Sequence, residues 1–154
     1  MAEKKIDITK QVDEEHQCIK RDLDRLKDSV MKEVSAEEFS EWKLELKLRV
    51  HDLRSHIEKH FDLEEAGGFR EEIRVVAPES MKEFDRLEGE HDSIIADLDQ
   101  ILADVKKIAN QNDEIIKDIQ NQVKQFVSRL RAHEGAENVL IQMVYSQDIG
   151  YPSA

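Results

Sequence analysis

The chain has 154 residues and a formal net charge of -12, so nucleic acids and anionic membrane surfaces are poor partners for it. Charged residues make up 38% of the sequence, with only five glycines and two prolines, which is typical of long amphipathic helices. No apolar run approaches the ~20 residues that span a bilayer, and the first residues carry no apolar segment typical of a secretory signal. The single cysteine, Cys18, excludes an internal disulfide and fits a reducing compartment, so we expect a cytoplasmic protein.

Four stretches carry apolar residues at spacings of mostly three and four, the period of helices that face a core. They predict helices at about 8–34, 36–66, 79–109 and 113–145. Ser35 and Glu38 form a capping box before the second helix. Pro78 suits the first turn of the third helix. Asn112 or Asp113 can cap the fourth helix.

The links between the predicted helices indicate the topology. Short links before the second and the fourth helix favour antiparallel neighbours. The longer link, 67–77, contains Phe69, Ile73, Val75 and Val76, so we expect it to fold over the adjacent end of the bundle. The tail after about Tyr145 is predicted to be irregular. The sequence therefore predicts one all-α domain over 1–154, an up-down-up-down four-helix bundle.

Six polar residues stand where the helical period calls for apolar side chains. They are His16, His60, Glu64, His91, His133 and Glu137. In an up-down-up-down bundle these positions fall within roughly two helical turns of one level. The two halves of the chain also echo each other, since Glu15-His16 and Glu90-His91 open similar strings and an H-x-x-x-E pair follows each. Buried imidazoles and carboxylates are costly unless they are paired or bind a metal, so the cluster suggests a two-metal site.

The ligand types narrow the choice of metal. Residues four apart share one face of a helix, so each H-x-x-x-E directs an imidazole and a carboxylate to one point. A carboxylate can bridge two ions while imidazoles fill terminal positions, which leaves room for water, an oxo bridge or a small ligand. Two histidines and a carboxylate for each ion favour iron, although zinc stays possible and ligand type does not separate iron from manganese. Calcium and magnesium would require more oxygen ligands. The alternative without metal is a set of hydrogen-bonded His–Glu pairs in the core.

With these motifs in place, the chain resembles the hemerythrin-like (HHE cation-binding) domain family, in the pattern H…H-x-x-x-E…H…H-x-x-x-E over nearly its whole length. The resemblance implies a four-helix bundle with two iron ions, which an oxo or hydroxo group could bridge. Oxygen-carrying hemerythrins are similar but have H-x-x-x-H on the third helix, where this chain has Ile95 four residues after His91. The four-His, two-Glu set is more similar to di-iron proteins that repair iron centres after nitric-oxide stress, and to the iron-responsive domain of a ubiquitin-ligase subunit.

Three functions follow as hypotheses. The first is a non-haem di-iron protein that binds or reacts with O2, NO or peroxide in sensing, scavenging or stress defence. The second is a di-iron oxidative enzyme, for instance one that dismutates peroxide, with the 67–77 link as its candidate lid. The third is a metal-free helical interaction module. The redox partner stays open, and we expect a monomer or a weak oligomer.

Residues beside the cluster are interpreted mainly as surface or boundary residues and not as ligands. Glu15 and Glu90 are expected on solvated helix faces, with a role beside the histidines as the alternative. Glu65 and Glu134 follow ligand positions but are rotated by about 100° from them, so they are expected to point elsewhere. His56 is interpreted as a boundary residue that could flank the site. His51 is expected at the surface, and Cys18 as a passive, half-buried thiol.

Overall fold

The computed structural model describes residues 2–66, 68–110 and 112–148, with side chains described over 10–144. Within these ranges the chain is helical and contains no strand. The elements are α1 (Ala2–Met31), α2 (Phe39–Ala66), α3 (Phe69–Val76), the 3₁₀ turn η1 (Pro78–Ser80), α4 (Met81–Gly89), α5 (His91–Lys107) and α6 (Asp113–Asp148). None of the helices in the described part of the chain is both long enough and apolar enough to cross a bilayer.

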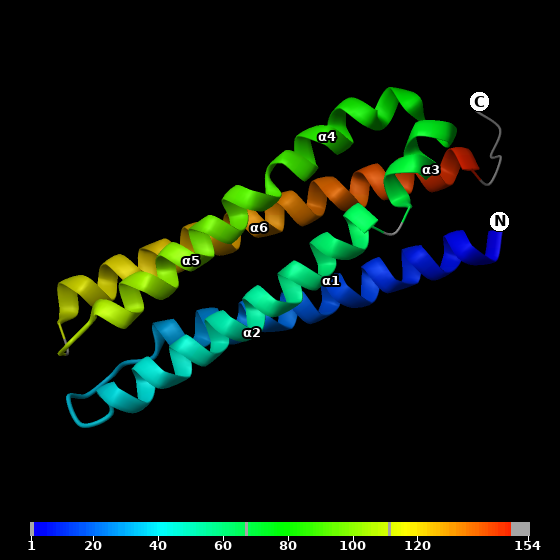
Figure 1. The fold of residues 1–154 in the computed structure, drawn as a ribbon. Coiled ribbons are helices and arrows are strands. Elements are labelled where there is room, and N and C mark those ends of the chain that lie inside the picture. Colours follow the sequence, from blue (N-terminus) through cyan, green and yellow to red (C-terminus); the bar gives the residue numbers. More distant parts are fainter. Residues whose placement is uncertain (1, 67, 111, 149–154) are drawn as a thin grey trace.

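Four rods run antiparallel: α1, α2, the α4–α5 pair and α6 (Figure 1). Helix α2 packs against α1 and α5, and α6 packs against the same two helices, so the bundle closes as a square. The α1–α2 and α5–α6 links lie at one end, while α3 and the first turn of α1 lie at the other (Figure 1). The predicted up-down-up-down four-helix bundle is confirmed.

The core has two apolar parts, one on each side of a polar level. The larger part fills the bundle from the α1–α2 link to Ile19 on α1 and Leu130 on α6. The smaller part lies at the α3 end and includes Val12, Phe84 and Leu140. On α1, α5 and α6 the polar residues of the predicted cluster fall between these two parts, and on α2 His60 and Glu64 lie on either side of Phe61, the last residue of the larger part on that helix. The polar residues thus form one layer across the bundle.

The link predicted to fold over the bundle end does so, as a short helix. Phe69, Ile73 and Ala77 are buried in the smaller apolar part, while Val75 on the opposite face is 69% exposed. Gly68 precedes α3 with a φ of 81°, a left-handed conformation that glycine adopts without strain. Since α3 belongs to the packed core, it is poorly suited to the role of a lid.

The predicted third helix, 79–109, is interrupted at Glu90, which separates α4 from α5. There the Glu90 N–H donates to the Leu87 carbonyl, 3.1 Å away and three residues back, instead of four residues back. Gly89, a poor helix former, directly precedes the interruption. The tightened turn leaves His91 as the first residue of α5.

Helix ends on three other rods also differ from the predicted ones. Helix α2 begins at Phe39 rather than 36, because 36–38 form a turn; the Ser35 hydroxyl accepts from the Glu38 N–H (3.3 Å) but donates to the Glu38 carboxylate (2.8 Å). Helix α1 spans 2–31 instead of 8–34. Helix α6 continues to Asp148, so 146–148 are helical and not irregular, and 149–154 lie outside the described residues.

Candidate metal centre

The bundle brings all six predicted side chains together. His16 comes from α1, His60 and Glu64 from α2, His91 from α5, and His133 and Glu137 from α6. Each is at most 8% exposed, and His60 is fully buried. The apolar residues on both sides fix how the four helices align along the bundle axis. This alignment brings the polar residues of all four helices to the same level.

The distances within the cluster are those of ligand atoms around a common centre. The Nε2 atoms of His16 and His60 are 3.0 Å apart. His60 Nε2 lies 2.8 Å from Glu64 Oε1 and 3.2 Å from Glu137 Oε2. The other oxygen of Glu137 lies 2.6 Å from His133 Nε2. Glu137 therefore stands between the two histidine pairs, with one oxygen toward each.

Three overlapping groups offer ligand atoms that all lie within 4.8 Å of one another. These are His16, His60 and Glu134; His60, Glu64 and Glu137; and His91, His133 and Glu137. Because His60 joins the first two groups and Glu137 the last two, the groups outline two adjacent positions that could each hold a metal ion. We call them the His16–His60 position and the His91–His133 position.

Each histidine is oriented by a hydrogen bond on its outer nitrogen, Nδ1. Glu15 accepts from His60 at 3.0 Å, and Glu90 accepts from His133 at 2.8 Å. The two remaining acceptors are Glu65 for His91, at 3.3 Å, and Asn138 for His16, at 3.0 Å. Since these oxygens only accept, Nδ1 carries the proton and Nε2 is directed into the cluster. Metal-binding histidines are held in this way by a carboxylate or carbonyl behind them.

Several inward atoms have no hydrogen-bond partner outside the cluster in the described part of the chain. They are Glu64 Oε1, His91 Nε2, His133 Nε2, Glu134 Oε2 and Glu137 Oε1. Within the cluster, Glu64 Oε1 contacts His60 Nε2 and Glu137 Oε1 contacts His133 Nε2. A buried polar atom without a partner is costly, and natural cores contain few of them. Five in one cluster, all on nitrogen or carboxylate oxygen, suit a cation that would coordinate them.

A model of the hemerythrin HHE cation-binding domain matches residues 7–144. The chain belongs to this family. Searches of curated proteins and of solved structures gave no significant match. In this hemerythrin-like chain the match covers all four rods and every residue of the cluster.

The electrostatics of this hemerythrin-like cluster follow from burial and from its short contacts. Burial disfavours the charged form of His60, but hydrogen bonds with carboxylates, Glu137 foremost, outweigh it and raise the pKa of His60 to about 12. Burial raises the pKa of Glu64 to about 8. Burial also acts against ionisation of Glu137, yet hydrogen bonds from three histidines hold its pKa well below the usual value. Protons on imidazoles thus balance the carboxylates where no cation is present, and metal binding would displace them.

The structure corrects the interpretations of four glutamates. Glu15, Glu65 and Glu90 were expected to face solvent or point elsewhere, but they hold the outer nitrogens of three histidines. Glu134 was expected to point away, but it is only 9% exposed and its Oε2 lies 3.6 Å from His16 Nε2. The repeat of a glutamate before His16 and His91 was the sequence signal for part of this set. No comparable signal marked Glu134.

The remaining residues lie outside the cluster. His56 pairs with Asp22 of α1 and is 41% exposed in its side chain, which fits the boundary interpretation. His51 is exposed, as expected. Cys18 is half-buried, and the Arg21 guanidinium lies 3.2 Å from its sulfur.

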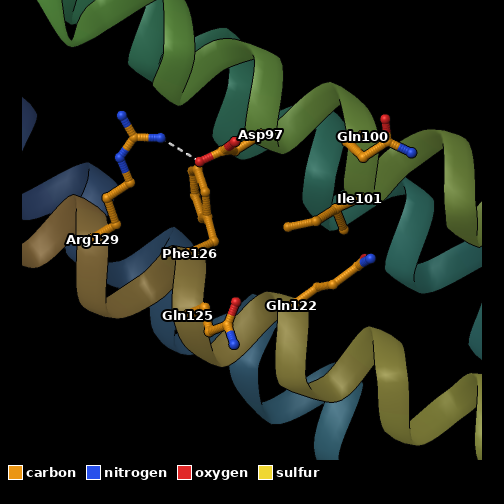
Figure 2. Close-up of a pocket in the computed structure, with 7 residues that line it drawn as sticks. All are labelled: Asp97, Gln100, Ile101, Gln122, Gln125, Phe126 and Arg129. Atoms are coloured by element: carbon orange, nitrogen blue, oxygen red, sulfur yellow. Dashed lines mark hydrogen bonds and ion pairs between the residues drawn. The ribbon is translucent and has the colours of Figure 1, made fainter.

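Grooves on the bundle surface show how small molecules could approach. One groove between α1 and α6 reaches His16 and Glu134, and another between α2 and α5 reaches His91 and Phe61. A third groove, between α5 and α6, contains no residue of the cluster (Figure 2). Its mouth carries the Arg129–Asp97 ion pair, and glutamines such as Gln122 line it (Figure 2). The first two grooves are therefore the approaches to the centre.

Proposed function

We propose that the cluster holds two iron ions and that the protein binds or reacts with a small ligand, O2, NO or peroxide, in sensing, scavenging or stress defence. The observation that carries the proposal is the set of five buried ligand atoms that face one another between the four helices and have no hydrogen-bond partner outside the cluster. Four oriented histidines and the carboxylates Glu64 and Glu137 are a donor set that suits iron. A pair of ferrous ions supplies electrons to oxidising ligands of this size.

The protein's own residues define what such a centre would do. The four outer acceptors keep each imidazole in one orientation, so the cluster is preorganised for cations. Apolar core on both sides limits the access of bulk water. Surface grooves reach His16 on one side and His91 on the other, so a ligand of two or a few atoms could approach the cluster along either groove.

Elemental analysis of untagged protein, reconstituted anaerobically with ferrous iron, tests the proposal. We expect close to two irons per chain in the wild type and loss of both in His60→Ala and Glu137→Ala, because these residues belong to two ligand groups each. His51→Ala, an exposed histidine on the same helix as His60, is the matched control and should stay loaded. A wild type that takes up no metal would refute the proposal and favour the metal-free interaction module.

The loaded protein then separates binding from catalysis. A spectrum that changes reversibly with O2 or NO supports a binding role. Rapid consumption of peroxide that stops on removal of the metal would instead support the oxidative enzyme. Helix α3 packs with Phe84 and Leu140 in the smaller apolar part, so we assign the 67–77 link no role as a lid.

A further inference from the structure

The two halves of the bundle correspond residue by residue around the cluster. His16 of α1 corresponds to His91 of α5, and the His60–Glu64 pair of α2 corresponds to His133–Glu137 of α6. The outer acceptors follow the same relation. Glu15 and Glu90 hold the histidine of the neighbouring H-x-x-x-E helix in their own half, whereas Glu65 and Asn138 each hold the lone histidine of the other half. A local pseudo-twofold axis therefore relates the two metal positions.

One pair of corresponding residues breaks this relation. Phe61 directly follows His60, and Glu134 directly follows His133. The Phe61 ring stacks on the His91 ring, with centroids 3.6 Å apart and planes 4° from parallel. In the other half, Glu134 lies beside His16, with Oε2 and Nε2 3.6 Å apart. An apolar cover at one position is thus replaced by a carboxylate at the other.

Glu134 has no compensating partner of the usual kind. Its side chain is buried, its Oε2 atom accepts no hydrogen bond, and within the described residues its ion-pair contact is with His16 and not with a lysine or arginine. A buried carboxylate oxygen without a hydrogen bond or a strong cationic partner destabilises the fold. Phenylalanine or leucine at this site would avoid that cost, as Phe61 does in the other half. A cation beside His16 and His60 would compensate it.

We propose that Glu134 is a seventh ligand, confined to the His16–His60 position, and that it makes the two metal positions inequivalent. This inference rests on the proposed function. A Glu134 oxygen and nitrogens of His16 and His60 lie within 4.8 Å of one another, as ligands of one ion must. Glu64 and Glu137 supply two negative charges for two divalent cations, and Glu134 adds a third beside one of them only.

The asymmetry has a consequence for the small ligand. The His91–His133 position has Phe61 where the other position has Glu134, so it receives fewer protein ligands. Its groove reaches His91 from the α2–α5 side. An ion with fewer protein ligands keeps more positions open, so O2, NO or peroxide binds at the His91–His133 position. The His16–His60 position, which has three carboxylates within reach, holds its ion more tightly.

An anaerobic ferrous titration followed by calorimetry tests the ligand role, with anomalous diffraction at the iron edge to assign each ion. In Glu134→Gln, which keeps the shape of the side chain, we expect one of the two affinities to fall about 10- to 100-fold or more. Iron should be lost from the His16–His60 position and retained at the His91–His133 position. Glu90→Gln is the matched control, because Glu90 holds His133 and its loss should weaken the opposite position.

The outcomes separate this inference from the proposed function. A wild type that binds no iron would overturn both. Two irons in the wild type with unchanged affinities in Glu134→Gln, or loss of iron from the His91–His133 position, would overturn the seventh ligand alone. Glu134→Ala serves as a second variant with the same expected loss, and far-ultraviolet circular dichroism of both variants without metal confirms that the helices are intact.

Discussion

At the scale of single residues, the orientation of the imidazoles sets the chemistry of the centre. A histidine side chain that rotates freely would lose conformational freedom on binding a cation. The hydrogen bond from Nδ1 to an outer oxygen fixes the ring before the cation binds. Glu15 does this for His60, the histidine at the middle of the cluster, although its own side chain is still 31% exposed. A half-exposed glutamate therefore belongs to the function of the site.

Replacement of Glu15 tests this orienting role. In Glu15→Ala the outer hydrogen bond to His60 is lost, and with it the orientation and part of the basicity of the ring. We expect affinity for ferrous iron to fall about 10- to 100-fold. Competition with a coloured chelator measures the change. Glu14→Ala removes an equal charge from the exposed neighbouring position and should leave the affinity unaltered. If both variants lost affinity equally, the change in net charge would explain the loss, and the orienting role of Glu15 would be contradicted.

The sequence predicted the inner residues of the site far better than the outer ones. His16, His60 and Glu137 lie in register with the apolar stripes, and a stripe specifies which residues face the bundle axis. Glu15 and Glu134 lie one residue beside a stripe position. Whether such a residue reaches the cluster depends on the rotation of its helix against its neighbours, which the helical period alone does not fix.

At the scale of elements, α3 shows how a link becomes part of the core. Its apolar residues are few, but Phe69 and Ile73 are spaced to share one face of a helix, and both are buried at the open end of the bundle. The sequence indicated that this link folds over the end, because its apolar residues need cover. It did not indicate a helix, because eight residues are too short for a convincing period.

Truncation of Ile73 measures what α3 contributes. This side chain is fully buried, so Ile73→Ala removes apolar contacts and leaves a cavity. We expect the free energy of unfolding to fall by about 2–5 kcal/mol. Val75→Ala on the same helix, 69% exposed, should change it by less than about 0.5 kcal/mol. Urea unfolding of both variants gives the comparison, and similar values for the two would show that α3 does not form part of the cooperative core.

The α1–α2 link offers a second test at this scale. At the start of the turn into α2, the Glu38 N–H donates to both the Ser35 carbonyl (3.1 Å) and the Ser35 hydroxyl (3.3 Å). Ser35→Ala should lower the free energy of unfolding by about 1 kcal/mol, within the usual range for the loss of such a cap. Ser40→Ala, at an exposed position within α2, removes a hydroxyl without a capping role and should be close to neutral. Thermal unfolding of the two variants distinguishes the cap from the mere loss of a hydroxyl.

The interruption at Glu90 went unpredicted for a simple geometric reason. Leu87, His91 and Ile94 keep spacings of four and three across it, so the apolar stripe continues through the tightened turn. A single hydrogen bond to the third residue back changes the rotation and rise of the chain too little to disturb that pattern. What the turn changes is the local direction of the chain beside His91, which the pattern of apolar residues does not record.

At the scale of the whole molecule, the polar level divides the core and makes stability depend on what occupies it. Without metal, protons must balance the buried carboxylates. The folded state holds a proton on His60 up to a pKa of about 12, whereas the unfolded chain releases it near 6.5. That contribution to stability is full below pH 6.5 and is lost as the pH rises toward 12. Burial raises the pKa of Glu64 to about 8 and that of Glu134 to about 7, from the usual 4.5. The unfolded chain loses these protons at lower pH than the folded chain does, so the free energy of unfolding falls as the pH rises from 4.5.

Above pH 6.5, His60 and Glu64 act in the same direction up to pH 8, and Glu134 joins them up to about pH 7. The groups whose titration would raise stability with pH act only below pH 6.5. Burial lowers the pKa of His91, so its cost is confined to pH values below its usual 6.5, and the depressed pKa of Glu137 affects stability only below 4.5. We therefore expect the metal-free protein to lose stability from pH 6.5 to pH 8, which urea unfolding midpoints at the two pH values measure.

A bound cation would oppose this loss of stability with pH. The ligands that bind a cation must give up the protons that the metal-free fold retains, so the cation binds more tightly at higher pH. The stabilisation by ferrous iron, the difference between the unfolding midpoints of loaded and metal-free protein, should be larger at pH 8 than at pH 6.5. Glu134→Gln carries no proton to release at that position, so its metal-free form should lose less stability over the same interval. A metal-free wild type that becomes more stable toward pH 8 would contradict the argument, since it would mean that the buried carboxylates ionise without cost.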